Sequence, residues 1–248
     1  MNAGEFSVSS APERRAGVLK LAIRRVCIGL AAAALSCSLQ AQVAPTDAEK
    51  AGYSGLLAAA ARGDAAQIKA LTAKGQNPDV RDRRSRTPLH VAAYGGHHDA
   101  MRALVAAGAN PNALEADRYD VVTIAAVADQ LATLKVALAV GCSPKNVTSR
   151  YDGTALIAAA HLGHAEVVRT LIRAGAPLDH VNNLGWTALI EAIALGDGDA
   201  RHTDTVRVLV EAGANVNLAD RTGQSPLALA RARGYADMVK ILERAGGK

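Results

Sequence analysis

The chain has 248 residues, of which 50% are apolar and only 3% aromatic, so alanine, leucine, valine and isoleucine carry its hydrophobicity. With 21% charged residues, 22 glycines and 8 prolines, the composition excludes a disordered, a collagen-like or a low-complexity chain. The formal net charge of +5 is unevenly distributed along the chain.

The first 41 residues have the layout of a signal peptide. The basic residues Lys20, Arg24 and Arg25 precede an uncharged run at 26–39. This run has the length of a secretory hydrophobic region and is shorter than the ~20 residues of a membrane span. We expect cleavage after Ala41 by the general secretion route and a periplasmic destination. Twin-arginine export stays an alternative because Arg24 and Arg25 are adjacent.

Removal of residues 1–41 changes the charge balance. This segment holds five of the 28 basic and two of the 23 acidic residues, which leaves 23 and 21 and a net charge of +2. Such a balance predicts no nucleic-acid partner for the mature chain.

Cysteine usage fits an exported chain. Cys27 and Cys37 lie in the expected leader, so Cys142 remains alone and no internal disulfide is predicted. Cys37 as a lipidated first residue is an alternative, but Ala34 stands where such signals usually carry leucine. We interpret Cys142 as a small filler of the core rather than a nucleophile.

Two ladders of residues recur along the chain. Glycines stand at intervals of 33, 33, 34, 38 and 33 residues: Gly75, Gly108, Gly141, Gly175, Gly213 and Gly246. Residues that can cap a helix form the second ladder: Ser54, Thr87, Asp120, Thr154, Thr187 and Ser225. A fixed period of this length indicates a repeat solenoid.

Each repeat is predicted to hold two helices and a long turn. Pro88 and Pro226 directly follow two caps, at the first helical position, where proline is tolerated. The residues predicted to end the first helix are Gly63, Gly96, Gly163, Gly196 and Gly234, with Asp129 in the third repeat. The second helix carries one apolar stripe, and the segment before the next cap, rich in Asn, Asp and Pro, predicts an extended hairpin.

The second repeat carries a family resemblance. Residues 86–93 read RTPLHVAA, Gly96-His97 follow, and residues 107–112 read AGANPN. This segment resembles an ankyrin repeat, and copies at 153–156, 185–189 and 223–227 keep the pattern. The third repeat departs most, because 120–123 read DVVT. The resemblance implies an all-α ankyrin-repeat solenoid of about six helix-turn-helix repeats joined by long hairpin turns.

The periods set the expected boundaries. A signal peptide at 1–41 and a short linker at 42–52 precede the repeat domain at 53–248, with repeats at about 53–80, 81–114, 115–148, 149–181, 182–219 and 220–248. A solenoid needs polar outer sides on its terminal repeats. Gln67 and Thr72 in the first repeat and Arg231 and Glu243 in the last meet that need. We therefore expect six repeats to form a complete array.

The histidines and acids offer little catalytic chemistry. The resemblance implies that His90 joins adjacent repeats, and His97 and His164 follow helix-ending glycines. The remaining histidines are His98, His161, His180 and His202, and none has zinc-site spacing. The insertion at 197–204 offers calcium ligands, but no bidentate glutamate follows at the required spacing. We predict a solvated loop there, with Asp204 near the next helix, and no metal, cofactor or catalytic residue.

The resemblance implies that partners bind on the concave face, formed by the first helices and the hairpin tips. Aromatic anchors with a few polar groups characterise binding hot spots. The candidate residues are Tyr94, Tyr119, Tyr151, His161, Leu162, Trp186, Glu191 and Leu195. A basic edge for an acidic partner is expected at Arg83, Arg84 and Arg86, next to Arg81. The alternatives are that the apolar residues pack between repeats and that the arginines form a solvated rim.

These observations predict a monomeric, non-catalytic module that binds a partner protein in the periplasm, without a stable membrane span. One alternative is an accessory or protective partner of a specific enzyme, in oxidative stress or toxin inhibition, which similarity to exported bacterial ankyrin proteins allows. Another is a metal-dependent enzyme that uses the insertion at 197–204. The repeat scaffold does not identify the partner, because unrelated targets share it.

Overall fold

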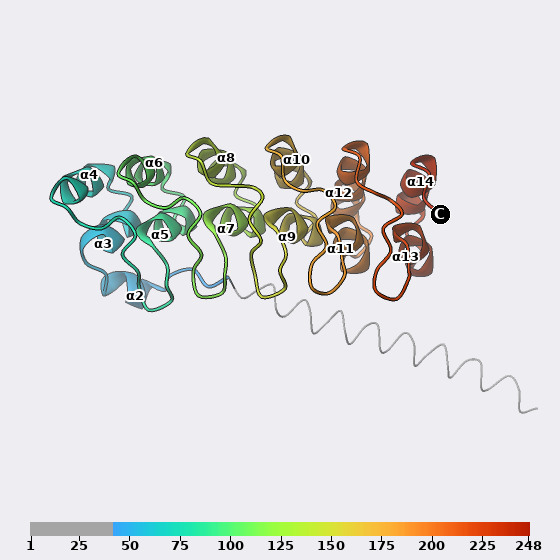
Figure 1. Cartoon of the computed structure of the whole chain (residues 1–248), viewed down its shortest axis with the longest axis horizontal. Helices are drawn as coiled ribbons and strands as arrows, with labels where there is room; N and C mark the ends of the chain where they lie inside the picture. The colour runs from blue at the N-terminus through green and yellow to red at the C-terminus, as the bar shows by residue number, and fades with distance from the viewer. Residues whose placement is uncertain (1–41) are drawn as a thin grey trace, which may run out of the picture. The chain divides into compact units, whose positions relative to one another are not determined.

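The computed structural model describes residues 42–248, and the expected signal peptide at 1–41 lies outside the described residues. This part of the chain is almost entirely helical (Figure 1). Its helices are α2 (Asp47–Ala51), α3 (Gly55–Ala61), α4 (Ala65–Ala73), α5 (Pro88–Tyr94), α6 (His98–Ala106), α7 (Val121–Val127), α8 (Leu131–Ala139), α9 (Ala155–His161), α10 (Ala165–Arg173), α11 (Ala188–Ala194), α12 (Ala200–Glu211), α13 (Pro226–Arg233) and α14 (Ala236–Arg244).

From α3 onward the helices pair into six repeats, as the sequence predicts. The first helices α3, α5, α7, α9, α11 and α13 form one row, and the second helices form a second row above it (Figure 1). Long turns join each repeat to the next and extend away from the second row. The chain is therefore a helical repeat solenoid.

The predicted caps begin the first helices. The side chains of Asp120, Thr154, Thr187 and Ser225 each accept a hydrogen bond from the backbone N–H three residues later. Thr87 uses a variant of this arrangement, because its own N–H donates to Nδ1 of His90 at 3.1 Å. Pro88 and Pro226 occupy the predicted first turns, where no intrahelical N–H partner is needed. Ser54 also stands at a helix start, but its side chain makes no capping bond.

The predicted helix ends hold with one exception. Gly63, Gly96, Gly163 and Gly234 have positive φ, and Asp129 substitutes for them with φ 53°. In the fifth repeat Gly196 is not left-handed, and Gly198 adopts φ 77° instead.

The insertion of the fifth repeat mainly extends a helix. Helix α12 has 12 residues where α10 has nine, and it begins at Ala200 after the cap Asp199. The prediction of a solvated loop with Asp204 near the start of the next helix is therefore wrong, because Asp204 lies within α12. The side chain of Asp199, which accepts from the N–H of His202 at 2.9 Å, stabilises the earlier start.

Pairs of small residues let the repeats pack closely. The first four repeats carry two neighbouring buried alanines at the centre of the first helix, and the fifth has isoleucine at the second position: Ala59-Ala60, Ala92-Ala93, Ala125-Ala126, Ala159-Ala160 and Ala192-Ile193. The second helices add larger apolar side chains from their inner faces. Cys142 is buried within this core, and burial raises the pKa of its thiol to about 12. The thiol therefore stays protonated at neutral pH, which fits a packing role.

A histidine near the start of the second helix joins the second, fourth and fifth repeats each to the repeat before it. Nε2 of His97 lies 3.1 Å from the carbonyl oxygen of Ala61, and Nδ1 of His164 lies 2.9 Å from that of Ala126. His202 makes the same kind of contact at 3.1 Å to the carbonyl oxygen of His161. The third repeat has Gln130 here, and its buried Oε1 has no hydrogen-bond partner within residues 42–248.

The ends of the described stack carry the predicted polar side chains. Gln67 is exposed in α4, and in the last repeat Arg231 and Glu243 form an exposed ion pair at 2.6 Å. The segment expected to be a short linker contains helix α2, which packs on α3. Thr46 and Glu49 start α2 with a reciprocal capping box, a signal that sequence analysis overlooked.

Candidate partner-binding surface

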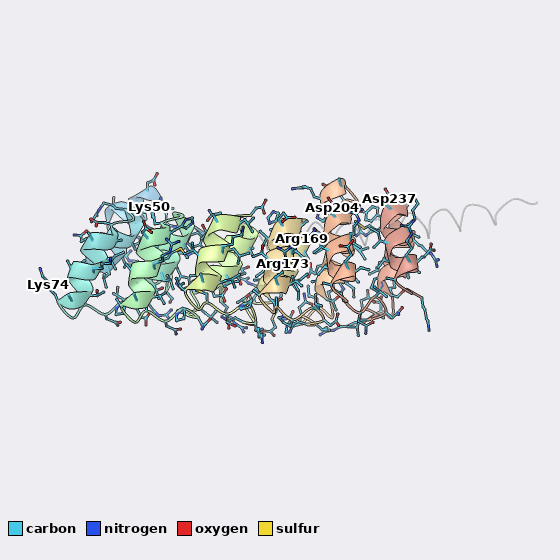
Figure 2. The ribbon with its side chains drawn as sticks, turned by 90° about the horizontal axis from the view of Figure 1, so that it is seen from above. Lys50, Lys74, Arg169, Arg173, Asp204 and Asp237 are labelled. Atoms are coloured by element: carbon cyan, nitrogen blue, oxygen red, sulfur yellow. The ribbon has the colours of Figure 1, made fainter. Side chains whose placement is uncertain are left out.

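The row of first helices and the adjoining hairpin turns form a surface that we call the first-helix face. It lies on the opposite side of the stack from the second helices, whose charged side chains appear in Figure 2. The labelled residues Arg169, Arg173, Asp204 and Asp237 belong to α10, α12 and α14 on that outer side.

Several predicted binding residues lie partly exposed on the first-helix face. Tyr151 and Leu162 belong to the fourth repeat, and Trp186 and Leu195 belong to the fifth. All four are half-buried, so each has a packed base and an accessible edge. Leu162 and Leu195 occupy equivalent positions, directly after α9 and α11. The fourth and fifth repeats thus each present one aromatic and one leucine side chain that are partly accessible.

Three other predicted residues are buried instead. Tyr119 is 4% exposed, His161 8% and Glu191 3%, so none offers much surface to a partner. Nδ1 of His161 lies 3.0 Å from one carboxylate oxygen of Glu191. Nδ2 of Asn182 donates to the other carboxylate oxygen at 2.9 Å. The acid expected to be open to a partner instead joins α9, the fifth hairpin turn and α11.

A recurring acceptor shapes the hairpin turns. In four turns one side-chain oxygen accepts from the N–H groups two and four residues later. The acceptors are Asp82, Glu115, Asn182 and Asp220. The second donor is always the residue before the helix cap, which includes Trp186. Sequence analysis missed this ladder, although its acidic and amide residues recur at the repeat spacing.

Arg86 does not lie on an exposed basic edge, so that prediction is wrong. Its side chain is 1% exposed, and its Nε donates to Asp82 at 2.7 Å. Its Nη2 donates to Glu49 at 2.7 Å and to the hydroxyl of Tyr53 at 3.2 Å. Burial raises the pKa of Asp82, but hydrogen bonds from Tyr53 and Arg86 outweigh it and lower the net value. A buried arginine needs such partners, which helix α2 and the hairpin supply.

Arg84 and Arg81 of the expected basic edge are held by hydrogen-bonding partners. Arg84 pairs with Asp117 at 3.0 Å, and Arg150 of the next hairpin lies 3.4 Å from the same carboxylate. Arg81 donates to the carbonyl oxygens of Ser85 and Leu114, both at 2.8 Å. Ion pairs between hairpin tips thus link successive repeats.

Arg83 is exposed, as is Arg81. It lines a cleft of about 690 Å³ between α2, α3 and the second hairpin turn, next to Tyr53 and Leu57. Within residues 42–248 its guanidinium makes no ion pair. One free cation at a rim is a weak basis for recognising an acidic partner.

The insertion brings two carboxylates to a histidine. Nδ1 of His202 lies 2.8 Å from Asp199 and 3.1 Å from Asp197. A hydrogen bond from the His202 backbone N–H is the largest influence that lowers the pKa of Asp199, and the His202 side chain adds to it. These are the groups in residues 42–248 that could jointly ligate a metal ion. Asp199 and His202 already have structural roles, however. Asp199 caps α12, and His202 contacts the fourth repeat.

Within residues 42–248 no helix is long and apolar enough to cross a bilayer.

Comparisons with known proteins agree with this architecture. A family profile described as "Ankyrin repeats (3 copies)" matches residues 30–115, 56–148 and 122–220. The ankyrin repeat protein YahD of Escherichia coli (strain K12) is 33% identical over 98 residues, which are 39% of this chain and 49% of YahD. The chain thus spans about half the length of YahD.

Solved structures resemble the chain over most of its length. An ankyrin repeat domain from Acinetobacter baumannii AYE shares 44% identity with a TM-score of 0.73, covering 78% of this chain and 98% of that domain. The ankyrin repeat domain of Bcl-3, a member of the IkappaB family, shares 29% identity with a TM-score of 0.71, covering 79% and 88%. Ankyrin repeats are generally protein–protein interaction modules and are typically not enzymes. The chain belongs to the ankyrin repeat family.

Proposed function

We propose that this protein is a non-catalytic module that binds a partner protein through the first-helix face of its fourth and fifth repeats. The observation that carries the proposal is the set of half-buried side chains of Tyr151, Leu162, Trp186 and Leu195 in two neighbouring repeats. Tyrosine and tryptophan are enriched in binding hot spots, and rigid repeats lower the ordering cost of association.

Buried hydrogen bonds beneath these side chains hold the hairpin turn of the fifth repeat in place. Asn182 holds the backbone N–H of Trp186 at 3.0 Å and binds Glu191, which in turn contacts His161. These buried contacts fix the hairpin that carries Trp186 relative to α9 and α11. A surface built in this way is largely preformed before the partner arrives.

The proposed site of action is the periplasm. Its support is the signal-peptide layout of the sequence at 1–41, with Lys20, Arg24 and Arg25 before an uncharged run. Mass spectrometry of the mature protein from the periplasmic fraction tests this point. The proposal expects an N-terminus at Gln42, and a full-length cytoplasmic chain would contradict it.

Site-specific photocrosslinking in the living host tests the binding face. A photoreactive residue replaces Leu162 or Leu195 on the first-helix face, and Arg173 or Asp204 on the outer side serves as the matched control. The proposal expects one discrete crosslinked protein from the first pair and none from the second. Adducts from the outer positions alone would refute it.

A further inference from the structure

The segment before α2 lies against the first-helix face of the first two repeats. We call residues 42–46 the N-terminal segment. In Figure 1 the chain preceding α2 runs beside α5, on the side away from α4 and α6. The carbonyl oxygen of Val43 accepts a hydrogen bond from Nη1 of Arg86 at 3.0 Å. Pro45 is buried, and together with Ala44 it faces the end of α5.

The anchor for this segment is rigid. Asp82 and Glu49 hold the other nitrogens of the Arg86 guanidinium, both at 2.7 Å. The remaining nitrogen of Arg86, Nη1, donates to the carbonyl oxygen of Val43, whose segment crosses the first-helix face. The surrounding wall of Val91, Tyr94 and Gly95 suits small apolar side chains. The site is therefore built for an extended peptide with a carbonyl toward Arg86.

The N-terminal segment fills this site imperfectly. A cavity of about 80 Å³ remains between Ala44, Pro45 and the ends of α3 and α5. Within residues 42–248 the buried Nε2 of Gln42 and the buried hydroxyl of Tyr94 have no hydrogen-bond partner. Each buried polar group without a partner destabilises an arrangement relative to one that satisfies it. A better-fitting peptide can therefore displace the segment.

We propose that the N-terminal segment is an intramolecular occupant of the partner-binding face, and that an extended apolar peptide of the partner replaces it. This inference rests on the proposed function, because it extends the face at repeats four and five to repeats one and two. Such a partner would offer a carbonyl to Arg86, small apolar side chains to Val91 and Gly95, and an acceptor to Tyr94.

The test uses the full chain and a peptide with the sequence of the segment, acetyl-Gln-Val-Ala-Pro-Thr-amide, added at millimolar concentration. In the variant Val43→Gly/Pro45→Gly the tethered segment loses the buried ring of Pro45 and gains backbone freedom at both positions, so its hold on the site weakens. The matched control is Pro144→Gly/Val147→Gly, which makes the same changes in another turn. Amide resonances of Val91, Tyr94 and Gly95 report binding.

The inference predicts that the peptide binds the Val43→Gly/Pro45→Gly variant at least tenfold more tightly than it binds the wild type or the control. A tether raises the local concentration of the segment to about the millimolar range, which explains the competition in the wild type. Equal affinity for all three proteins, or no binding to the opened variant, would overturn the inference.

A second variant tests the same inference in case the first variant does not fold. Pro45→Asp places a carboxylate in the small apolar cavity and should also release the segment, with faster hydrogen exchange at 43–46 and the same gain in peptide affinity. A folded Pro45→Asp protein without either change would reject the inference. Failure here leaves the crosslinks at Leu162 and Leu195 unaffected, so the proposed function and this inference fail separately.

Discussion

Glu191 uses both of its carboxylate oxygens to join two repeats. It is 3% exposed and contacts His161 of α9 and Asn182 of the fifth hairpin turn. The oxygen of Asn182 then holds the backbone N–H of Trp186. At the residue scale, a buried polar group therefore helps to fix the backbone that carries Trp186.

Replacing Glu191 with alanine should lower the free energy of unfolding by about 2 kcal/mol. The change leaves polar atoms of His161 and Asn182 buried without an acceptor, and each such group carries a penalty of about 1–3 kcal/mol. Urea denaturation measures the effect, with the exposed Glu211→Ala in α12 as the control. Equal midpoints for the two variants would contradict the assigned role of Glu191.

His90 should make the protein sensitive to mild acid. Burial lowers the pKa of His90 from 6.5 to about 4 in the folded state, and Nδ1 accepts from Thr87. Between these two values the unfolded chain binds the proton more readily, so stability is lost as the pH falls from about 6.5 to about 4. The full difference between the two pKa values of His90 corresponds to about 3 kcal/mol in the free energy of unfolding.

Urea denaturation of the wild type and His90→Gln at pH 7 and pH 5 checks this expectation. Glutamine can donate and accept but does not titrate, so the variant should lose stability at pH 7 and show a weaker pH dependence. A pH dependence identical to that of the wild type would assign the acid sensitivity to other groups.

At the element scale, the junction between the second and third repeats lacks the histidine–carbonyl contact that three other junctions have. A β-carbon built on Gly63 would meet the ring of His97 at 2.7 Å, and one on Gly163 would meet the ring of His202 at 3.2 Å. A β-carbon on Gly96 would meet only Thr133, at 4.0 Å. The histidine ring that would fill this space is replaced by Gln130.

Gln130→His should therefore stabilise the protein by about 1 kcal/mol. The ring would fill the space beside Gly96 and donate to a carbonyl at the end of α5, as His97 does toward α3, which is a typical net gain for one hydrogen bond. Thermal denaturation tests this, with Gln67→His in exposed α4 as the control. A lower melting temperature for Gln130→His alone would show that the junction has no room for the ring.

Local signals were enough to predict most helices. The caps and the helix-ending residues act over three to nine positions, so Thr187 or Asp129 can be read without tertiary information. The start of α12 was misplaced because Asp199 and Asp204 are both plausible caps, and the contact of His202 with the fourth repeat favours the earlier one. Helix α2 has only five residues and depends on packing against α3.

The binding surface was less predictable than the helices. Position within a repeat indicates which face a residue occupies, and that holds for Trp186 and Leu195. Exposure depends on neighbours from other parts of the chain, which cover Tyr119 and bury Arg86 beneath Val43 and Glu49. A repeat pattern contains no information on a segment that precedes it.

At the scale of the whole molecule, each repeat relies on its neighbours for burial. Val206 and Leu209 of α12 are fully buried, and α12 packs against α14 of the last repeat. Deletion of residues 215–248 would expose these side chains, so we expect aggregation and a lower melting temperature. Analytical ultracentrifugation provides the measurement. A monomeric truncated protein with an unchanged melting temperature would contradict the role of the last repeat as a cap.

The central claim is that the first-helix face of the fourth and fifth repeats binds the partner. The most direct measurement is calorimetric titration of the crosslinked partner, once purified, into three proteins: the wild type, Tyr151→Ala/Trp186→Ala and Arg169→Ala/Arg173→Ala. If each of the two aromatic side chains contributes about 2 kcal/mol to binding, the affinity of the first double variant for the partner should fall at least 100-fold. The outer-face variant should stay within twofold of the wild type. Equal affinities for the two double variants would contradict the claim.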